Sequence, residues 1–497
     1  MSSRLSRRWV ITRGLVGGVG LAIAGRAGAR MGGGGDPPPG PAFRDPPVLP
    51  DSSTVPGIVE VSVEARPELL TVAGAPATLL TYEGQFIAPT LRARRGDLVR
   101  MHFHNSLPED GTNLLGHVRG ATNVHVHGWH VSPTGIADNV HIRVERNQPF
   151  DYEYDLSTQE PGTLGLYHPH IHGTVAEQMW AGMVGALDVA DEVAALSAYE
   201  THLLLLKDLT VAGGEPAPHA MMRDYMHGLE GNWALVNGDL NPVLSMRPGQ
   251  VQRWRFINVS NARFYRLGLE GHSLALVGTD GGLLDRPYVV PELLVSPGER
   301  VDVLVQVPRR GTYRLFALPY ARMGMMASPR ITLMTVSVAG AEAGDALPRV
   351  VNPDAHRIPV DYQASARFTL SMGQGRGYIN GISFGEKSFV HMSRLGDVEL
   401  WEIVNESGMD HPWHQHVNAC QLVSASGGDS VYAAYARLYA QTPAWKDVVI
   451  VPKWGSVRML VPVMDFPGMT MFHCHIVEHE DIGMMAMWHI MDGSMPM

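Results

Sequence analysis

The stretch Leu395-Gly396-Asp397-Val398-Glu399-Leu400 begins with a turn glycine and continues as an alternating run that closes at Asn405. A second turn signal, Ile379-Asn380-Gly381, precedes it. Apolar and polar residues that alternate after a glycine turn are typical of a β-strand with one buried face. The stretch therefore predicts β-structure in this part of the chain.

The same pattern occurs twice more, and each time an asparagine lies nine residues after the second glycine. The other copies are Tyr82-Glu83-Gly84 with Gly96 and Asn105, and Val236-Asn237-Gly238 with Gly249 and Asn258. The second glycines are 153 and 147 residues apart, which is the spacing of whole domains rather than of solenoid repeats. We therefore expect three homologous antiparallel β-sandwich or barrel domains, over residues 56–191, 192–345 and 346–497.

The overall composition agrees with a large globular protein. The chain has 497 residues, of which 45% are hydrophobic and 18% charged, and its length alone suggests about three domains. Its formal net charge is −10, which argues against nucleic acid or an anionic membrane as a partner.

The N-terminus has the features of a targeting segment. Arg7 and Arg8 precede a short apolar run over residues 14–24, and Ala27-Gly28-Ala29 is a suitable cleavage site. Residues 1–29 thus resemble a twin-arginine export signal, and the run is too short for a membrane anchor. We expect an exported protein, periplasmic or extracellular, whose glycine- and proline-rich residues 30–55 form a flexible leader.

The stretch His473-Cys474-His475, followed by His479 and Met484, offers a thiolate, imidazoles and a thioether, a ligand set that suits copper. In an extended segment the side chains alternate, so His473 and His475 face away from Cys474 and can bind other metal ions than the cysteine does. The alternatives are a structural zinc site or buried residues without a metal. Zinc sites usually combine two short-spaced ligand pairs, and nothing in the chain pairs with this stretch in that way.

Three more histidine clusters lie in the first and third repeats, and the middle repeat has none. They are Thr122-Asn123-Val124-His125-Val126-His127, His168-Pro169-His170 and His411-Pro412-Trp413-His414-Gln415-His416. Histidines two residues apart on a strand project from the same face and can serve one metal or two neighbouring metals. A single pair would be weak evidence, but four clusters together indicate a metal site.

These four motifs, in this order, resemble those of the three-domain multicopper oxidases, the laccase-like and cuprous-oxidase group, from about Pro56 to Trp488. The resemblance implies three consecutive cupredoxin-like (plastocyanin-like) Greek-key domains and four copper ions per chain. It implies a type 1 copper held by His411, Cys474, His479 and Met484, and a type 2 copper held by His125 and His414. The two type 3 coppers would take His127, His168 and His475, and His170, His416 and His473. The three-copper cluster would lie between the first and third domains, with the middle domain as a spacer and substrate-side wall.

The resemblance also implies a reaction. A substrate would give single electrons to the type 1 copper, and the path from Cys474 to its neighbouring histidines would carry them to the cluster, where dioxygen is reduced to water. Glu480 matches a position at which the family has an acid serving this reduction. Asp138, eleven residues after His127, is a candidate for a second acid; the alternative for both is an ordinary solvated carboxylate.

Two kinds of electron donor fit the sequence, and Met409, Asp410 and Trp413 beside His411 are the substrate-side candidates. We expect laccase-like oxidation of phenols and aromatic amines by a monomeric enzyme. The alternative is oxidation of Cu(I), because Met409 resembles a substrate-copper ligand and further methionines cluster at Met221, Met222, Met226, Met323, Met325 and Met326. A non-enzymatic copper-binding or scaffold protein of the cell envelope is a third possibility, although such proteins lose copper ligands that this chain keeps.

Overall fold

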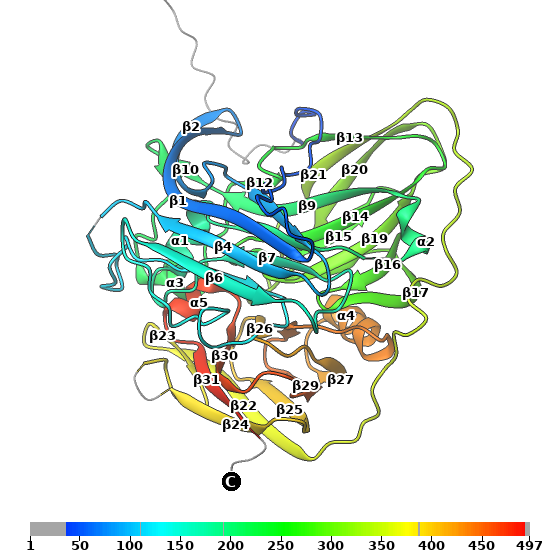
Figure 1. Ribbon diagram of the computed structural model, residues 1–497. Coiled ribbons are helices and arrows are strands. Elements are labelled where there is room, and N and C mark those ends of the chain that lie inside the picture. The colour runs from blue at the N-terminus through cyan, green and yellow to red at the C-terminus, as the bar shows by residue number, and fades with distance from the viewer. Residues whose placement is uncertain (1–35, 110, 192, 386–387, 493–497) are drawn as a thin grey trace, which may run out of the picture.

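Each of three consecutive parts of the chain forms two β-sheets, coloured blue to cyan, green, and yellow to red in Figure 1. The computed structural model describes residues 36–109, 111–191, 193–385 and 388–492. The three predicted β-sandwiches are thereby confirmed, whereas their exact boundaries stay a prediction.

The first part contains sheets in the order β2-β1-β4-β6 and β3-β8-β7-β5. Its elements are β1 (Ile58–Val72), β2 (Ala75–Tyr82), β3 (Ala88–Ala93), β4 (Leu98–Asn105), β5 (His125–His127), β6 (Pro149–Asp155), β7 (Leu164–His168), α1 (Val175–Ala181) and β8 (Gly185–Val189).

The middle part contains sheets in the order β12-β9-β14-β19-β16-β17 and β13-β21-β20-β15-β18, and a small β10-β11 hairpin. Its first elements are α2 (Ala194–Ser197), β9 (Glu200–Leu209), β10 (Val211–Ala212), β11 (Glu215–Pro216), α3 (Met222–His227), β12 (Trp233–Val236), β13 (Val243–Met246) and β14 (Val251–Asn258). The remainder are β15 (Tyr265–Leu269), β16 (Leu274–Thr279), β17 (Gly282–Val290), β18 (Leu293–Val295), β19 (Arg300–Gln306), β20 (Gly311–Leu318) and β21 (Ile331–Val338).

The third part contains sheets in the order β23-β22-β25-β29-β27 and β24-β31-β30-β26-β28. Its elements are β22 (Ala364–Gly373), β23 (Arg376–Ile379), β24 (Phe389–Arg394), β25 (Val398–Asn405), β26 (His411–Gln415), β27 (Gln421–Ser426), α4 (Ser430–Gln441), β28 (Val448–Val451), β29 (Ser456–Pro462), β30 (Gly468–Cys474), α5 (Val477–Asp481) and β31 (Met485–Met491).

The repeat seen in the sequence corresponds to one strand of each sandwich. Strands β4, β14 and β25 each pair in parallel with an earlier strand (β1, β9 or β22) and antiparallel with a later one (β6, β19 or β29). Each strand ends at its repeat asparagine: Asn105, Asn258 or Asn405.

The three asparagines make the same hydrogen bonds, and all are buried. Each side-chain amide donates to two backbone carbonyls at 2.8–3.1 Å, and each Oδ1 accepts from the backbone N–H two residues on. Buried carbonyl and N–H groups must find partners, and one asparagine provides three of them where the strand ends. This requirement explains why the residue recurs at a fixed distance from the turn.

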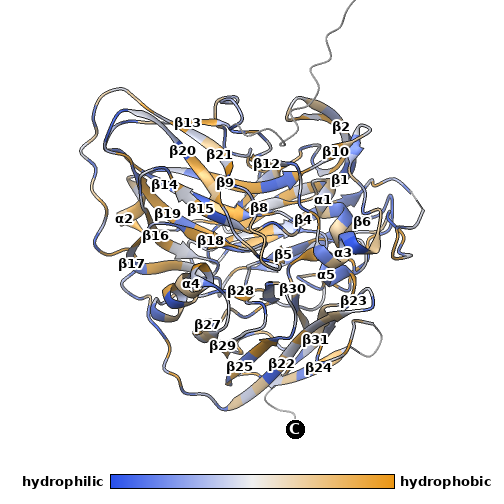
Figure 2. Ribbon diagram, turned by 180° about the vertical axis from the view of Figure 1, so that it is seen from behind, coloured by the Kyte–Doolittle hydropathy of each residue, from blue (hydrophilic) through white to orange (hydrophobic). Residues whose placement is uncertain are grey.

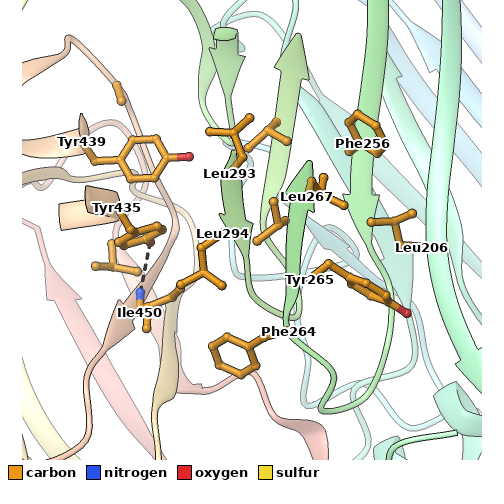
Figure 3. Packing of buried hydrophobic residues seen from close by; sticks show 14 of the residues in the cluster. Leu206, Phe256, Phe264, Tyr265, Leu267, Leu293, Leu294, Tyr435, Tyr439 and Ile450 are labelled. Atoms are coloured by element: carbon orange, nitrogen blue, oxygen red, sulfur yellow. Dashed lines mark hydrogen bonds between the residues drawn. The ribbon is translucent and has the colours of Figure 1, made fainter. Parts of the chain in front are cut away.

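Apolar packing continues from the middle sandwich into the third. In Figure 3, Leu293 and Leu294 of β18 lie opposite Tyr435 and Tyr439 of α4, within one hydrophobic cluster that spans both sandwiches. The Tyr435 hydroxyl accepts a hydrogen bond from the Ile450 N–H at 3.2 Å. Strands such as β20 and β21 are largely apolar, whereas α3 and α5, which lie side by side, are more polar (Figure 2). The sandwiches are therefore joined by a continuous core rather than by loose linkers.

The segment from residue 36 to residue 55 is packed, so the expectation of a flexible leader is wrong for these residues. Gly40 N–H donates to Asn241 at 2.7 Å and Phe43 N–H to Val243 at 2.8 Å, both in the middle sandwich. Leu49 N–H donates to Thr90 of the first sandwich at 2.9 Å. The backbone adds to the edges of two sandwiches, a role that glycine and proline content does not reveal.

The proposed signal peptide, residues 1–29, and residues 30–35 lie outside the described residues. Within the described ranges, no helix has the length and hydrophobicity needed to cross a membrane.

Candidate metal centres

Eight histidines of the first and third sandwiches meet in one buried cluster. Strand β5 pairs with β7 so that His125 lies opposite His168, and β26 pairs with β30 so that His414 lies opposite His473. The loops that follow these strands add further histidines. The eight residues are His125, His127, His168, His170, His414, His416, His473 and His475, each at most 2% exposed.

Two sets of histidines approach one another closely within the cluster. The Nε2 atom of His473 lies 3.2 Å from the Nε2 atoms of both His170 and His416. His475 Nε2 lies 3.1 Å from His127 Nδ1, and the ring of His168 is centred 5.9 Å from that of His127 and 5.5 Å from that of His475.

His125 and His414 complete the cluster. His125 stacks on His416 at 4.0 Å between ring centres, and His414 stacks on His127 at 3.7 Å. The ligand atoms of His125, His414 and His416 all lie within 4.8 Å of one another, close enough to share one metal ion.

Most imidazoles of this cluster are held neutral, and several have a nitrogen that is left unpaired. Burial lowers the pKa of most of them, in the case of His473 to about 3. The Nε2 atoms of His125, His168 and His414 are buried without a hydrogen-bond partner. A buried unpaired nitrogen is costly, and a neutral imidazole with a free nitrogen is the form that binds a metal ion. The cluster therefore fits a metal site of borderline-soft ions.

A second group forms around Cys474. Its Sγ lies 3.4 Å from His411 Nδ1 and 3.5 Å from His479 Nδ1, and these two nitrogens are 3.2 Å apart. Met484 is fully buried beside them: its N–H donates to His479 at 2.8 Å and its carbonyl accepts from Cys474 N–H at 3.0 Å. Burial raises the pKa of the Cys474 thiol, so binding of a metal ion here would release its proton.

The group around Cys474 is covered from the middle sandwich. The outer nitrogen of His411 contacts the Ser407 hydroxyl at 2.8 Å, and that of His479 faces the Met226 carbonyl of α3 at 3.3 Å. Arg322 connects the end of α3 to the loop before His411. Its guanidinium donates to the His227 carbonyl at 2.7 Å and contacts Met409 Sδ at 3.8 Å. Both histidines are consequently 0% exposed.

Both acids predicted from the sequence face the eight-histidine cluster. The Asp138 oxygens lie 2.9 Å from His125 Nδ1 and accept from Val126 N–H at 3.0 Å, which directs the free Nε2 of His125 into the cluster. The Glu480 oxygens lie 3.5 Å from His170 Nδ1 and 3.4 Å from His473 Nδ1. Burial, with the nearby Asp481, raises the pKa of Glu480 well above its usual range.

Asp447 and Arg300 also belong to the cluster, although the sequence did not point to them. Asp447 Oδ1 lies 3.0 Å from His127 Nε2 and accepts from Arg300 Nη1 at 2.6 Å. Arg300 comes from β19 of the middle sandwich, is fully buried, and also donates from Nε to the Leu164 carbonyl at 2.7 Å. The middle sandwich thus touches the cluster, so describing it as a spacer was incomplete. The charged pair Lys446-Asp447, directly before the apolar strand β28, was the signal that could have indicated this site.

Two of the three donor-side candidates do not reach the surface. Trp413 is 0% exposed because its ring lies in the core of the third sandwich, where it stacks on Phe472 and packs against Trp401 of the facing sheet. Asp410 is 1% exposed and accepts from the Tyr320 hydroxyl at 2.6 Å and from Lys453 N–H at 2.8 Å. The expectation that these two residues face a donor is wrong. Met409 keeps a small exposed fraction of 8%.

A cavity of about 760 Å³ opens beside the eight-histidine cluster. His125, His414 and His416 form part of its wall, together with Trp129 and Trp445. Small molecules can therefore approach the cluster from this side without passing the cysteine.

Comparison with known proteins matches three successive parts of the chain to multicopper oxidase family models, at residues 65–193, 200–336 and 355–494. The chain is 25% identical to a multicopper oxidase of Staphylococcus haemolyticus, over 82% of this chain and 83% of the relative. It is 26% identical to a laccase of Bacillus stratosphericus, over 82% of this chain and 90% of the relative.

Among solved structures, a metallo-oxidase of Campylobacter jejuni superposes with a TM-score of 0.79 at 27% identity, covering 91% of this chain and 96% of that one. The three sandwiches therefore have the cupredoxin-like fold of such oxidases. Because the three matches together cover most of the chain, this protein belongs to the multicopper oxidase family.

Proposed function

We propose that this multicopper oxidase couples the one-electron oxidation of phenols and aromatic amines to the four-electron reduction of dioxygen to water, as a laccase does. The observation that carries the proposal is the arrangement around one peptide. Cys474 faces His411 and His479, while its neighbours His473 and His475 face the eight-histidine cluster.

The proposal assigns four copper ions to the buried nitrogens and the thiolate. A type 1 copper would be held by His411, Cys474, His479 and Met484, and a type 2 copper by His125 and His414. The type 3 pair would be held by His127, His168 and His475, and by His170, His416 and His473. The support for this assignment is that the histidine donors are buried and in part unpaired, and that burial keeps His414 and most of the others neutral, as imidazole ligands of copper need to be.

Copper would supply the one-electron redox chemistry, and the protein's own residues provide connection, orientation and protons. The covalent path from Cys474 to His473 and His475 joins the two centres through a single peptide. Asp138 fixes the orientation of His125 by accepting from its Nδ1. Glu480, whose pKa burial raises well above its usual range, places an acidic group within 3.5 Å of His170 and His473.

The surface around the Cys474 group favours aromatic donors. An exposed indole, Trp454, lies beside the loop that leads to His411. The likeness to a laccase of Bacillus stratosphericus points in the same direction.

Oxidation of Cu(I) is the second candidate, because five methionines near this face are exposed: Met221, Met222, Met323, Met325 and Met326. Thioethers are soft ligands that bind Cu(I), and the likeness to a metallo-oxidase of Campylobacter jejuni fits this alternative. A scaffold protein without catalysis is less well supported, since the chain keeps Cys474 and all ten histidines.

The proposal includes export through residues 1–29 and action as a monomer outside the cytoplasm. A fusion of residues 1–35 to a reporter that folds before export tests the signal, and Arg7→Lys with Arg8→Lys should retain the reporter in the cytoplasm. Sedimentation of the purified protein tests the monomer.

Steady-state oxidation of 2,6-dimethoxyphenol and of chelated Cu(I) by the copper-loaded protein tests the choice of donor. The proposal predicts a blue absorption band, oxygen uptake and a higher kcat/KM for the phenol. A higher kcat/KM for Cu(I) would favour the metal-ion oxidase. Oxygen reduction with an artificial donor but with neither substrate would show that both assignments are wrong.

A further inference from the structure

The turn between β28 and β29 carries an unusual residue, Trp454. The turn is closed by Gly455 N–H, which donates to the Pro452 carbonyl at 3.0 Å, and Trp454 is its third residue with φ of 55°. Glycine or asparagine is favoured at such a position, since a bulky residue with positive φ is strained. The side chain is 71% exposed, so burial does not compensate for the strain.

No other tryptophan in the described ranges is exposed. A strained backbone that displays a large aromatic ring to solvent is explained neither by folding nor by packing. Strain of this kind is a feature of binding and catalytic sites.

The position of Trp454 links it to the Cys474 group. Its N–H donates to the Ser407 carbonyl at 3.1 Å, and the Ser407 hydroxyl contacts His411 Nε2 at 2.8 Å. The indole also closes over Gly408, where an added Cβ would lie 3.6 Å from Cζ2. One residue, Ser407, thus separates the exposed indole from a histidine of this group.

A surface hollow of about 340 Å³ lies next to the indole. Its wall includes Trp454, Asn405, Ser456 and the ion pair of Arg367 with Glu402. An aromatic face at one end and polar groups at the other suit a planar ring that carries hydroxyl or amino substituents.

A donor needs such a place because it cannot touch the histidines themselves. His411 and His479 are both 0% exposed under α3, Ser407 and Arg322. Electrons must therefore pass through the residues that cover the two histidines. Ser407 is such a residue, and its hydroxyl contacts His411 directly.

We propose that Trp454 and the adjoining hollow form the docking site of the aromatic electron donor, a phenol or aromatic amine whose ring stacks on the indole. This inference rests on the proposed laccase-like function. The role is binding: Trp454 positions the donor beside Ser407 and is not itself oxidised.

Kinetics of three variants test the site: Trp454→Asn, Trp454→Phe and the control Tyr362→Asn. Tyr362 is also an exposed aromatic residue, at 42%, but its neighbour Gln363 bonds to Val398 at the opposite end of β25. Trp454→Asn should raise KM for 2,6-dimethoxyphenol about five- to tenfold, the worth of one aromatic stacking contact. Trp454→Phe and Tyr362→Asn should leave KM within about twofold of the original protein.

Stability separates docking from a structural role. Because asparagine tolerates positive φ, Trp454→Asn should raise Tm by about 1–2 °C and leave the blue absorption band unchanged. A lower Tm together with an altered blue band would mean that Trp454 supports the His411 loop, and would overturn the proposal.

Binding to the reduced protein distinguishes failure of the site from failure of the proposed function. Under anaerobic conditions the fully reduced holoenzyme binds 2,6-dimethoxyphenol without turnover, and saturation-transfer NMR reports the contact. If the original protein gives a saturation-transfer signal and Trp454→Asn weakens it, the result supports the docking site. This holds even if the oxidised enzyme turns over no phenol. Equal signals, or an unchanged KM in an enzyme that does oxidise phenols, would show that the docking site is wrong while the function stands.

Discussion

The two candidate metal centres are one residue apart on β30, yet different ionisable groups lie beside them. Three acidic side chains, Asp138, Asp447 and Glu480, face the eight-histidine cluster, and one of them, Asp447, is paired with Arg300. The group around Cys474 instead has the cation Arg322 above it, and this charge contributes to lowering the pKa of both His411 and His479.

This difference matches the two halves of the proposed reaction. Reduction of dioxygen to water consumes protons, so carboxylates that bind and release protons belong beside that cluster. A centre that only accepts and passes electrons needs no proton, and a nearby cation stabilises its reduced form. Each region can therefore be disturbed in a way that leaves the other intact.

The largest effect is expected for Cys474→Ser. Loss of the only thiolate at the centre should abolish both the blue absorption band and donor-driven oxygen uptake, because the link between the centres starts at this sulfur. The matched control is Cys420→Ser, which changes the other buried free cysteine. Absorption spectra and oxygen-electrode traces of both variants check the result, and a blue Cys474→Ser protein would contradict the assignment.

Glu480→Gln should act on oxygen reduction alone. An amide cannot deliver a proton, so we expect reoxidation of the reduced enzyme to slow by about 10²–10⁴-fold, with copper content and the blue band unchanged. In the original protein the rate should fall as pH rises through the raised pKa of Glu480, since only the protonated acid donates. Stopped-flow reoxidation across pH measures both effects. If the rate of Glu480→Gln still fell with rising pH in the same way, another group would be the proton donor.

Asp447→Asn should have a smaller effect on the same cluster. The change weakens the support of His127 and removes the nearer carboxylate partner of Arg300, leaving Asp280 at 3.8 Å, and outer-shell partners of this kind are worth about 10–100-fold in activity or metal affinity. Asp302→Asn is the control, because Asp302 pairs with a buried arginine, Arg253, elsewhere in the middle sandwich. Copper analysis and oxygen uptake should separate the two variants; equal losses would point to general destabilisation.

The smallest effect is expected at the Cys474 group, for Arg322→Gln. Removing the cation should lower the reduction potential of this centre by tens of millivolts, corresponding to about 1 kcal/mol. Arg322→Lys, which keeps the charge, should change the potential less. Redox titration of the blue band measures the shift, and an unchanged potential would mean that the charge is screened.

The sequence was most informative where chemistry requires particular residue types at fixed spacing. The asparagine nine residues after a glycine predicted three equivalent strands, because one side chain must satisfy several buried backbone groups. The histidine and cysteine motifs predicted residues that the structure brings together, since few other residue types bind copper.

What the sequence left hidden depends on contacts between distant segments. Arg300 and Asp447 are 147 residues apart and meet only when the middle and third sandwiches pack. Trp413 looked suitable for a donor surface because it lies close to His411 in the sequence, but its ring packs into the core between the two sheets of the third sandwich. The packing of residues 36–55 likewise arises from sheet edges that no local pattern describes.

The asparagine that ends β14 has one further consequence. Asn258 keeps the full set of hydrogen bonds seen in the other sandwiches, although the middle sandwich carries none of the copper motifs. The middle sandwich therefore keeps this framework without a copper motif of its own. For protein engineers, a new redox centre could be introduced into the middle sandwich, provided that Arg300 and Arg322, which contact the two candidate centres, are kept.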